Sequence, residues 1–312
     1  MPSPWPASES LRRGTVFRAL RLSLLGAVLL LFAPGCNGFF YFPTRDVYER
    51  SKLMPTEHED VWFESGDGTK LHGWFLPGKG AVRGTVVHFH GNGANLTNHI
   101  SFVAWLAFEG FNVFTFDYRG YGQSEGSASR EGVHQDALAA LNTIRAREDV
   151  DPDRLVVLGQ SLGGAVALAA LGEGGRVGVR GVAVESTFLD YQEVANGKIG
   201  GTCVTWPLAW LLVGGDHSPA DSLEALGTLP KLVIHGDDDP VVGFENGERL
   251  FEALSEPKLF LRVNGGGHIQ ALRYPGVGRP LLVEFFSRCL GVSPERRELD
   301  ALDAKSLQDW ED

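Results

Sequence analysis

The sequence contains little cysteine and no excess of positive charge. Only three cysteines occur among 312 residues, without a C-x-x-C pair or a Cys/His cluster, so we expect neither a disulfide framework nor structural zinc. The formal net charge of −11 argues against a nucleic-acid partner, because contacts to phosphates need a basic patch. The glycines after Gly159 lack the lysine of a phosphate-binding P-loop. No metal and no cofactor is therefore predicted.

The N-terminus carries an apolar run that is shorter than a typical membrane-spanning helix. Four arginines precede an uncharged stretch from Leu22 to Phe32, and Cys36 follows, which is the order of an export signal. Cleavage before Cys36 would leave a lipidated cysteine, as in bacterial lipoproteins. Alternatively, the uncharged stretch continues through residues 39–42 and acts as a membrane anchor. Both hypotheses place the remaining chain on the extracytoplasmic side of a membrane, and a cytosolic protein is the remaining alternative.

The two other cysteines leave their pairing open. Cys203 and Cys289 could form a disulfide if the domain lies outside the cytoplasm, provided that their geometry permits it. We favour two unpaired, buried thiols.

The pattern of apolar residues predicts strands that alternate with helices after an opening hairpin. Strands are expected over 61–65, 70–76, 85–90, 112–116, 155–158, 179–184, 231–235 and 259–263, and helices over 96–108, 132–147, 163–170, 245–254 and 280–290. This order predicts an α/β fold with a mostly parallel sheet of about eight strands and helices on both faces. Ligands in such folds bind beyond the carboxyl ends of the strands.

The chain divides into three parts. Residues 1–42 form the N-terminal signal or anchor, 43–292 the α/β domain and 293–312 an acidic tail. Residues 190–229 break the alternation, and their tryptophans Trp206 and Trp210 stand among apolar residues. This stretch is either a buried helix or a small cap whose apolar face, with both tryptophans, would receive an acyl chain. Both interpretations can hold together.

The segment Gly159-Gln160-Ser161-Leu162-Gly163 lies where an apolar strand runs into a helix of small residues. A G-x-S-x-G at a strand-to-helix turn is typical of a nucleophile elbow, in which small neighbours tolerate a strained serine. The serine hydroxyl then lies at a helix N-terminus, where oriented N–H groups favour developing negative charge. We therefore predict that Ser161 is a nucleophile.

A serine nucleophile needs a base and an acid that orients it. His268 follows the last strand in a glycine-rich loop and is the predicted base. Asp239, the last acid of His235-Gly236-Asp237-Asp238-Asp239, is the predicted acid, with Asp237 or Asp238 as alternatives and Glu185 as a distant one. The chain order Ser161, Asp239, His268 is that of a known class of serine hydrolases.

Two backbone N–H groups should stabilise an oxyanion. The N–H of Leu162 is one candidate, and the second is expected from His90-Gly91-Asn92-Gly93, first from Asn92 and next from Gly93. His88 and His90 share one face of a strand, which would also fit a metal site. The glycines and asparagines that follow make an oxyanion loop the better interpretation.

These motifs together resemble the α/β-hydrolase superfamily. The matching segments lie between residues 58 and 290, and they are His88–Gly93, Asp117–Gly126, the Ser161 elbow, Glu185–Phe188, His235–Asp239 and Gly267-His268. The chain is most similar to membrane-anchored α/β-hydrolase-domain serine hydrolases, a group with acyl-protein thioesterases, lipid esterases and serine aminopeptidase-like members. The resemblance implies that Arg119 and Tyr121 support the loop near the site.

The resulting hypothesis is a serine hydrolase that cleaves a carboxylic ester or thioester through an acyl-enzyme, with a small-molecule or lipid-like acyl substrate. A peptidase or amidase of the same fold is the first alternative. A membrane-tethered binding protein without catalysis is the second, although such proteins usually lose a member of the triad, and none is missing here.

Overall fold

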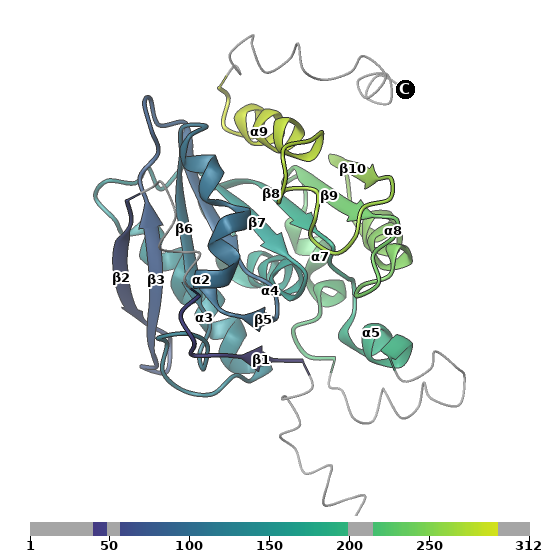
Figure 1. The fold of residues 1–312 in the computed structure, drawn as a ribbon, viewed down its shortest axis with the longest axis horizontal. Coiled ribbons are helices and arrows are strands. Elements are labelled where there is room, and N and C mark those ends of the chain that lie inside the picture. Colours follow the sequence, from purple (N-terminus) through teal and green to yellow (C-terminus); the bar gives the residue numbers. More distant parts are fainter. Residues whose placement is uncertain (1–39, 49–56, 199–214, 293–312) are drawn as a thin grey trace, which may run out of the picture.

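The computed structural model describes residues 40–48, 57–198 and 215–292. Its central sheet has eight strands, which are β2 (Glu59–Glu64), β3 (Lys70–Leu76), β4 (Gly84–Phe89), β6 (Phe111–Asp117), β7 (Leu155–Gln160), β8 (Val179–Glu185), β9 (Lys231–Gly236) and β10 (Lys258–Val263). They are arranged in the order β10-β9-β8-β7-β4-β6-β3-β2, from one edge of Figure 1 to the other. Strand β3 is antiparallel to both neighbours, and all other pairs are parallel. The predicted mostly parallel α/β sheet is therefore confirmed.

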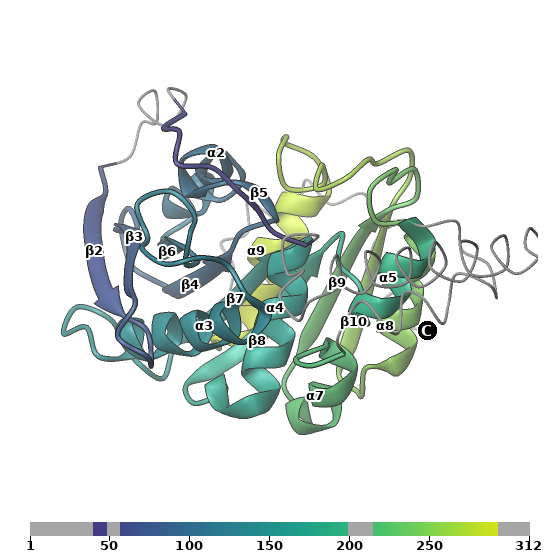
Figure 2. The same ribbon diagram turned by 90° about the horizontal axis from the view of Figure 1, so that it is seen from below.

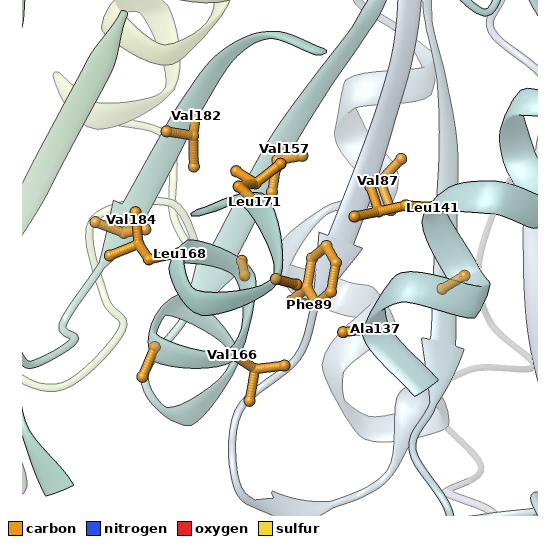
Figure 3. Packing of buried hydrophobic residues seen from close by; sticks show 14 of the residues in the cluster. Val87, Phe89, Ala137, Leu141, Val157, Val166, Leu168, Leu171, Val182 and Val184 are labelled. Atoms are coloured by element: carbon orange, nitrogen blue, oxygen red, sulfur yellow. The ribbon is translucent and has the colours of Figure 1, made fainter. Parts of the chain in front are cut away.

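Helices cover both faces of this sheet because the strands are apolar on both sides. On one face, Val87 and Val157 belong to a core shared with α3 (Arg130–Arg145), α4 (Leu162–Ala170), α7 (Pro219–Leu226) and α8 (Phe244–Ala253). On the other face, Val86 and Val156 pack with α2 (Leu96–His99) and α9 (Gly278–Cys289). Figure 2 gives a second view of these layers, and Figure 3 shows Val166 and Leu168 of α4, and Leu171 directly after it, against the strands.

The predicted helix over 96–108 is wrong in its form. The structure has the short helix α2 followed by two 3₁₀ turns, Ile100–Phe102 and Ala104–Ala107. Val103 leaves the helical region with φ −128°, and its N–H bonds to the Ile100 carbonyl three residues back. The α-helical hydrogen-bond pattern cannot continue through this residue, while its apolar neighbours remain buried against the sheet.

The N-terminal part of the described chain belongs to the folded domain. Strand β1 (Phe42–Pro43) pairs in parallel with β5 (Gly93–Ala94), directly after β4. Phe40 and Tyr41 are buried in the same core as α4. The domain therefore includes residues 40–42, which the sequence analysis assigned to the N-terminal segment.

The expected cap, residues 190–229, contains α5 (Tyr191–Lys198) and α7 in its described parts. Leu223 and Leu226 of α7 are buried in the core beside α4, so this helix is part of the domain's helical layer. Trp206, Trp210, Cys36, Cys203 and the acidic tail over 293–312 lie outside the described residues. Cys289 is a half-buried free thiol, and burial raises its pKa to about 12. Among the described residues, none of the helices has both the length and the apolar character of a membrane span.

Candidate active site

Ser161 occupies a sharp turn between β7 and α4. Its backbone has φ 53° and ψ −124°, a conformation that residues other than glycine rarely adopt. A Cβ added at Gly159 would lie 2.5 Å from the Cα of Gly164, and one at Gly163 would collide with the Phe89 carbonyl oxygen. Both glycines are therefore required by close backbone approach, which explains the G-x-S-x-G pattern physically.

The structure brings Ser161, His268 and Asp239 into one hydrogen-bonded row. His268 Nε2 lies 3.0 Å from Ser161 Oγ, and His268 Nδ1 lies 2.8 Å from Asp239 Oδ2. When Nδ1 carries the ring proton and donates a hydrogen bond to the Asp239 carboxylate, Nε2 is free to accept the serine proton. Ser161 is 8% exposed, so its hydroxyl is shielded but reachable from one side. The row can activate a serine as a nucleophile.

The other candidate acids have different partners. Asp237 accepts hydrogen bonds from Arg262 (3.0 Å) and from the Gly265 N–H (2.6 Å). Asp238 is exposed. Glu185 is buried and contacts the backbone beyond His268. Of these four candidate acids, all within the described chain, Asp239 is the one that hydrogen-bonds to the imidazole of His268.

Asp239 lies in surroundings that keep it charged. Burial opposes its ionisation, yet hydrogen bonds from His268 and from the Val242 and Val241 N–H groups outweigh this, and the pKa of the carboxyl is lowered. The two N–H groups donate to Oδ1 at 2.9 and 2.8 Å. His235 Nε2–H donates to the Val242 carbonyl and so helps to fix the turn that follows Asp239. Asp239 thus presents a fixed, ionised acceptor to His268.

The predicted oxyanion donors lie beside Ser161. Leu162 is the first residue of α4, so its N–H has no acceptor within the helix. Gly91, Asn92 and Gly93 line the same cavity as Ser161, and a Cβ added at Gly91 would lie 3.5 Å from the Ser161 Cβ. The Asn92 side chain is engaged elsewhere, because its Oδ1 accepts from the Phe42 N–H (2.9 Å) and the Tyr121 hydroxyl (3.1 Å). Asn92 can therefore act on an oxyanion through its backbone N–H.

Two supports of this loop were missed by the sequence analysis. His99 donates from Nε2 to the Gly93 carbonyl (2.8 Å), and burial lowers its pKa to about 3, so it stays neutral. Strand β1 holds the loop from the other side through the pairing of Phe42 with Gly93. No motif surrounds His99, and β1 has the composition of an anchor, so the sequence carried no signal for either support. Arg119 binds Asp136 (2.8 Å) and Asp67 (2.7 Å) at a distance from the cavity lining.

A cavity of about 640 Å³ opens over Ser161. Its walls are mainly apolar side chains, which are Phe40, Phe42, Leu162, Phe188, Val194, Val241, Val242 and Ile269. Ser161, His268 and the glycines of the predicted oxyanion loop also line this cavity. The cavity has the size of a small-molecule site and would accept an apolar group next to a reacting carbonyl.

The histidines that suggested metal chemistry have other partners. His88 bonds to Thr115 and Gln160, and His90 Nδ1 lies 2.7 Å from the Gly91 carbonyl oxygen. Within the described residues, His134, Glu173 and His217 have ligand atoms close together. The two imidazoles stack at 4.0 Å with planes 10° apart. His134 Nε2 and His217 Nδ1 both contact Glu173 Oε2, at 3.1 and 3.0 Å, and these contacts account for the cluster.

The arrangement of β1 leads to a prediction about truncation. A chain that starts at Arg45 loses the Phe42 hydrogen bond to Asn92 and two buried aromatics, Phe40 and Tyr41. We expect a lower melting temperature and a loss of about 10- to 100-fold in kcat, because a displaced oxyanion donor costs up to about 10²–10³. The control is a chain that starts at Phe40, which should remain active. Equal kcat and stability of both chains would contradict a supporting role of β1.

Comparison with known proteins shows which family and which relatives this chain is similar to. Residues 80–214 match the family described as serine aminopeptidase, S33. The chain is 38% identical over 258 residues to protein YfhR of Escherichia coli K12, covering 81% of this chain and 87% of that one. It is 33% identical over 201 residues to the α/β hydrolase domain-containing protein WAV2 of Arabidopsis thaliana, covering 59% of this chain and 63% of that one.

Among solved structures, the chain is similar to the Pyrococcus furiosus esterase Pf2001. The TM-score is 0.65 at 22% identity, over 80% of this chain and 97% of the esterase, which is a likeness of fold. The strained serine, its ordered partners and these similarities lead to the same assignment. The chain belongs to the α/β-hydrolase superfamily.

Proposed function

We propose that this protein is a serine hydrolase that cleaves carboxylic esters or thioesters through an acyl-enzyme. The observation that carries the proposal is the row Ser161–His268–Asp239, which opens on an apolar cavity. A hydroxyl in hydrogen-bond contact with an imidazole, itself held by a carboxylate, is the arrangement that activates serine for acyl transfer.

The proposed reaction has two halves. His268 Nε2 takes the proton of Ser161, whose Oγ attacks the carbonyl carbon of the substrate. The N–H of Leu162 and the backbone N–H of Asn92 stabilise the negative charge on the carbonyl oxygen. His268 then protonates the leaving alcohol or thiol. In the second half, His268 removes a proton from water, and the water oxygen attacks the acyl carbonyl. The bond from the acyl carbon to Ser161 Oγ then breaks, His268 returns the proton to Oγ, and the acid is released.

The cavity walls favour an apolar acyl group. Phe40, Phe42 and Phe188 line it together with valine and leucine side chains. Burying such a group contributes about 0.8 kcal/mol per methylene, so affinity should rise with acyl length until the cavity is full. The proposed substrate is therefore a medium or long acyl ester or thioester.

We further propose that the N-terminal segment attaches the enzyme to a membrane on its extracytoplasmic side. Only three residues separate Cys36 from Phe40, and the four residue steps between them span at most ~14 Å of extended chain. Phe40 lines the cavity, so a lipid on Cys36 would keep the cavity near the bilayer. This placement suits a lipid-like acyl substrate.

The test is a panel of substrates on the chain that starts at Phe40. Acyl esters and thioesters of two to sixteen carbons are compared with aminoacyl amides, and Ser161→Ala provides the background. We expect kcat/KM to rise over the shorter chains by about fourfold per methylene, which corresponds to about 0.8 kcal/mol, and esters and thioesters to exceed amides.

The main alternative is a peptidase or amidase, which the S33 family match favours. It predicts that aminoacyl amides are the best substrates of the panel and that acyl length has little effect. A protein that binds acyl compounds without turnover would show saturable binding but no product above the Ser161→Ala background. Either outcome would replace the esterase proposal.

A further inference from the structure

A row of buried polar side chains runs under the active site across four strands. Thr115 of β6 contacts His88 Nδ1 of β4 at 3.0 Å, and His88 Nε2 contacts Gln160 Oε1 of β7 at 3.1 Å. Gln160 Nε2 then donates to Glu185 Oε2 of β8 at 2.6 Å. All four side chains are 0–1% exposed. Buried polar groups persist only when their hydrogen bonds are made, so this row is a built feature of the fold.

Glu185 joins this row to the segment that carries His268. Its Oε1 accepts from the Ala271 N–H at 2.8 Å and from the Leu272 N–H at 3.3 Å. The next residue, Ser186, accepts the Ile269 N–H on its hydroxyl at 3.1 Å. Glu185 also accepts the Ser161 N–H on its backbone carbonyl at 2.8 Å. One residue thus bonds to the nucleophile's backbone and to the loop of the base.

The carboxylate of Glu185 at one end of the row determines which group donates and which accepts in each hydrogen bond. Both carboxylate oxygens of Glu185 accept from N–H groups, so Gln160 must present its NH₂ to Glu185 and its oxygen to His88. His88 then donates from Nε2 and accepts the Thr115 hydroxyl proton on Nδ1. Burial lowers the pKa of His88 well below its ordinary value, so this histidine is neutral. Burial raises the pKa of Glu185, and the N–H donors on both oxygens favour its ionised form.

We propose that Glu185 is a positioning residue, whose carboxylate fixes the backbone at Ala271 and Leu272 and thereby holds His268 Nε2 on Ser161 Oγ. It is not a second catalytic acid, because its carboxylate bonds to the loop backbone and to Gln160, while Asp239 occupies His268 Nδ1. The kinetic part of this inference rests on the proposed hydrolase function.

The first variant is Glu185→Gln. Its amide cannot accept at both ends. Either an NH₂ group meets the Gln160 NH₂ or the Ala271 N–H, or the Gln160 amide and the His88 tautomer must both reverse, and in every case the loop N–H groups lose a charged acceptor. We expect kcat to fall about 10- to 100-fold, the effect of a ~1 Å misplacement of a catalytic group. KM should stay within about twofold, because Glu185 does not line the cavity and substrate binding is unchanged.

The double variant E185Q/Q160E separates positioning from general damage. In it, the amide introduced at position 185 accepts the two loop N–H groups on its oxygen and donates from its NH₂ group to the carboxylate introduced at position 160. That carboxylate in turn accepts from His88, so every bond is restored with the charge moved to the neighbouring strand. We expect at least a tenfold recovery of kcat over E185Q. The single variant Gln160→Glu places two carboxylates together and should remain impaired.

Amide hydrogen exchange provides a readout that does not depend on hydrolysis. Residues 269–272 should exchange faster in E185Q than in the parent chain and return to slow exchange in the double variant. If the parent hydrolyses no acyl substrate, the proposed function fails, while exchange still tests Glu185.

Parent-like exchange and kcat in E185Q would overturn the inference. A double variant that is folded but no better than E185Q would also overturn it. If E185Q does not fold, the double variant decides: a folded, active double variant supports positioning, and an inactive or unfolded one contradicts it.

Discussion

Replacing Ser161 by alanine is expected to lower kcat toward acyl esters by about 10⁶-fold, the scale seen when a serine nucleophile is removed from a triad. The reason is that the hydroxyl, 3.0 Å from His268 Nε2, is the group that forms the covalent intermediate. Removing it leaves only the oxyanion donors and substrate binding. The measurement is steady-state hydrolysis of the best ester of the panel, followed with purified protein.

The control for this variant is Ser101→Ala. Ser101 is exposed, and its hydroxyl donates to the Asn98 carbonyl on the surface. This variant should hydrolyse the ester at the parent rate. A Ser161→Ala protein with parent-like melting temperature and more than a tenth of the parent kcat would show that another group performs the chemistry.

Replacing Asp239 by asparagine is expected to lower kcat by about 10⁴-fold. The Val241 and Val242 N–H groups need the Oδ1 acceptor, so the new NH₂ group must face His268 Nδ1. His268 Nδ1 then accepts, its proton moves to Nε2, and the nitrogen that faces Ser161 becomes a donor. The base is thereby present in the wrong tautomer.

The adjacent aspartates provide matched controls for this result. Asp238→Asn should keep the parent kcat because Asp238 is exposed. Asp237→Asn weakens contacts to Arg262 and Gly265, and a loss below about tenfold is expected, because these contacts lie outside the triad. A larger loss in Asp237→Asn than in Asp239→Asn would assign the acid to Asp237 instead.

The alternation of strands and helices and the approximate positions of the candidate site residues could be predicted from the sequence because they depend on local patterns. Buried β-branched runs give β4, β7 and β9, and glycine at positions 159 and 163 marks the elbow around Ser161. The choice among Asp237, Asp238 and Asp239 depends on side-chain direction within one turn. Sequence spacing carries no information on that direction, so several candidates remained.

Residues 40–42 were assigned to the wrong part of the chain because the same composition suits two environments. Phe40, Tyr41 and Phe42 are as apolar as a membrane segment, but in the fold they pack in the core or line the cavity. The support by His99 was also hidden, since it depends on burial and on a contact to Gly93. Such tertiary contacts cannot be deduced from one chain by periodicity.

The role of Glu185 lies between these two cases. Its position at the end of β8 is predictable, and its candidacy as an acid followed from that position. Its bonds to Gln160 and Ala271 place the carboxylate under the loop instead of on the imidazole. In the proposed account, Glu185 positions the loop that carries His268, while Asp239 orients the imidazole for proton transfer.

The most direct test of the account is the site of a covalent adduct. The protein is treated with a fluorophosphonate probe and, separately, with a slowly hydrolysed acyl ester, and the modified peptide is identified by mass spectrometry. We predict one adduct on Ser161 with each reagent, none in Ser161→Ala, and slower formation in Asp239→Asn. An adduct on another residue, or equal modification of the Ser161→Ala protein, would contradict the assignment of Ser161 as the nucleophile.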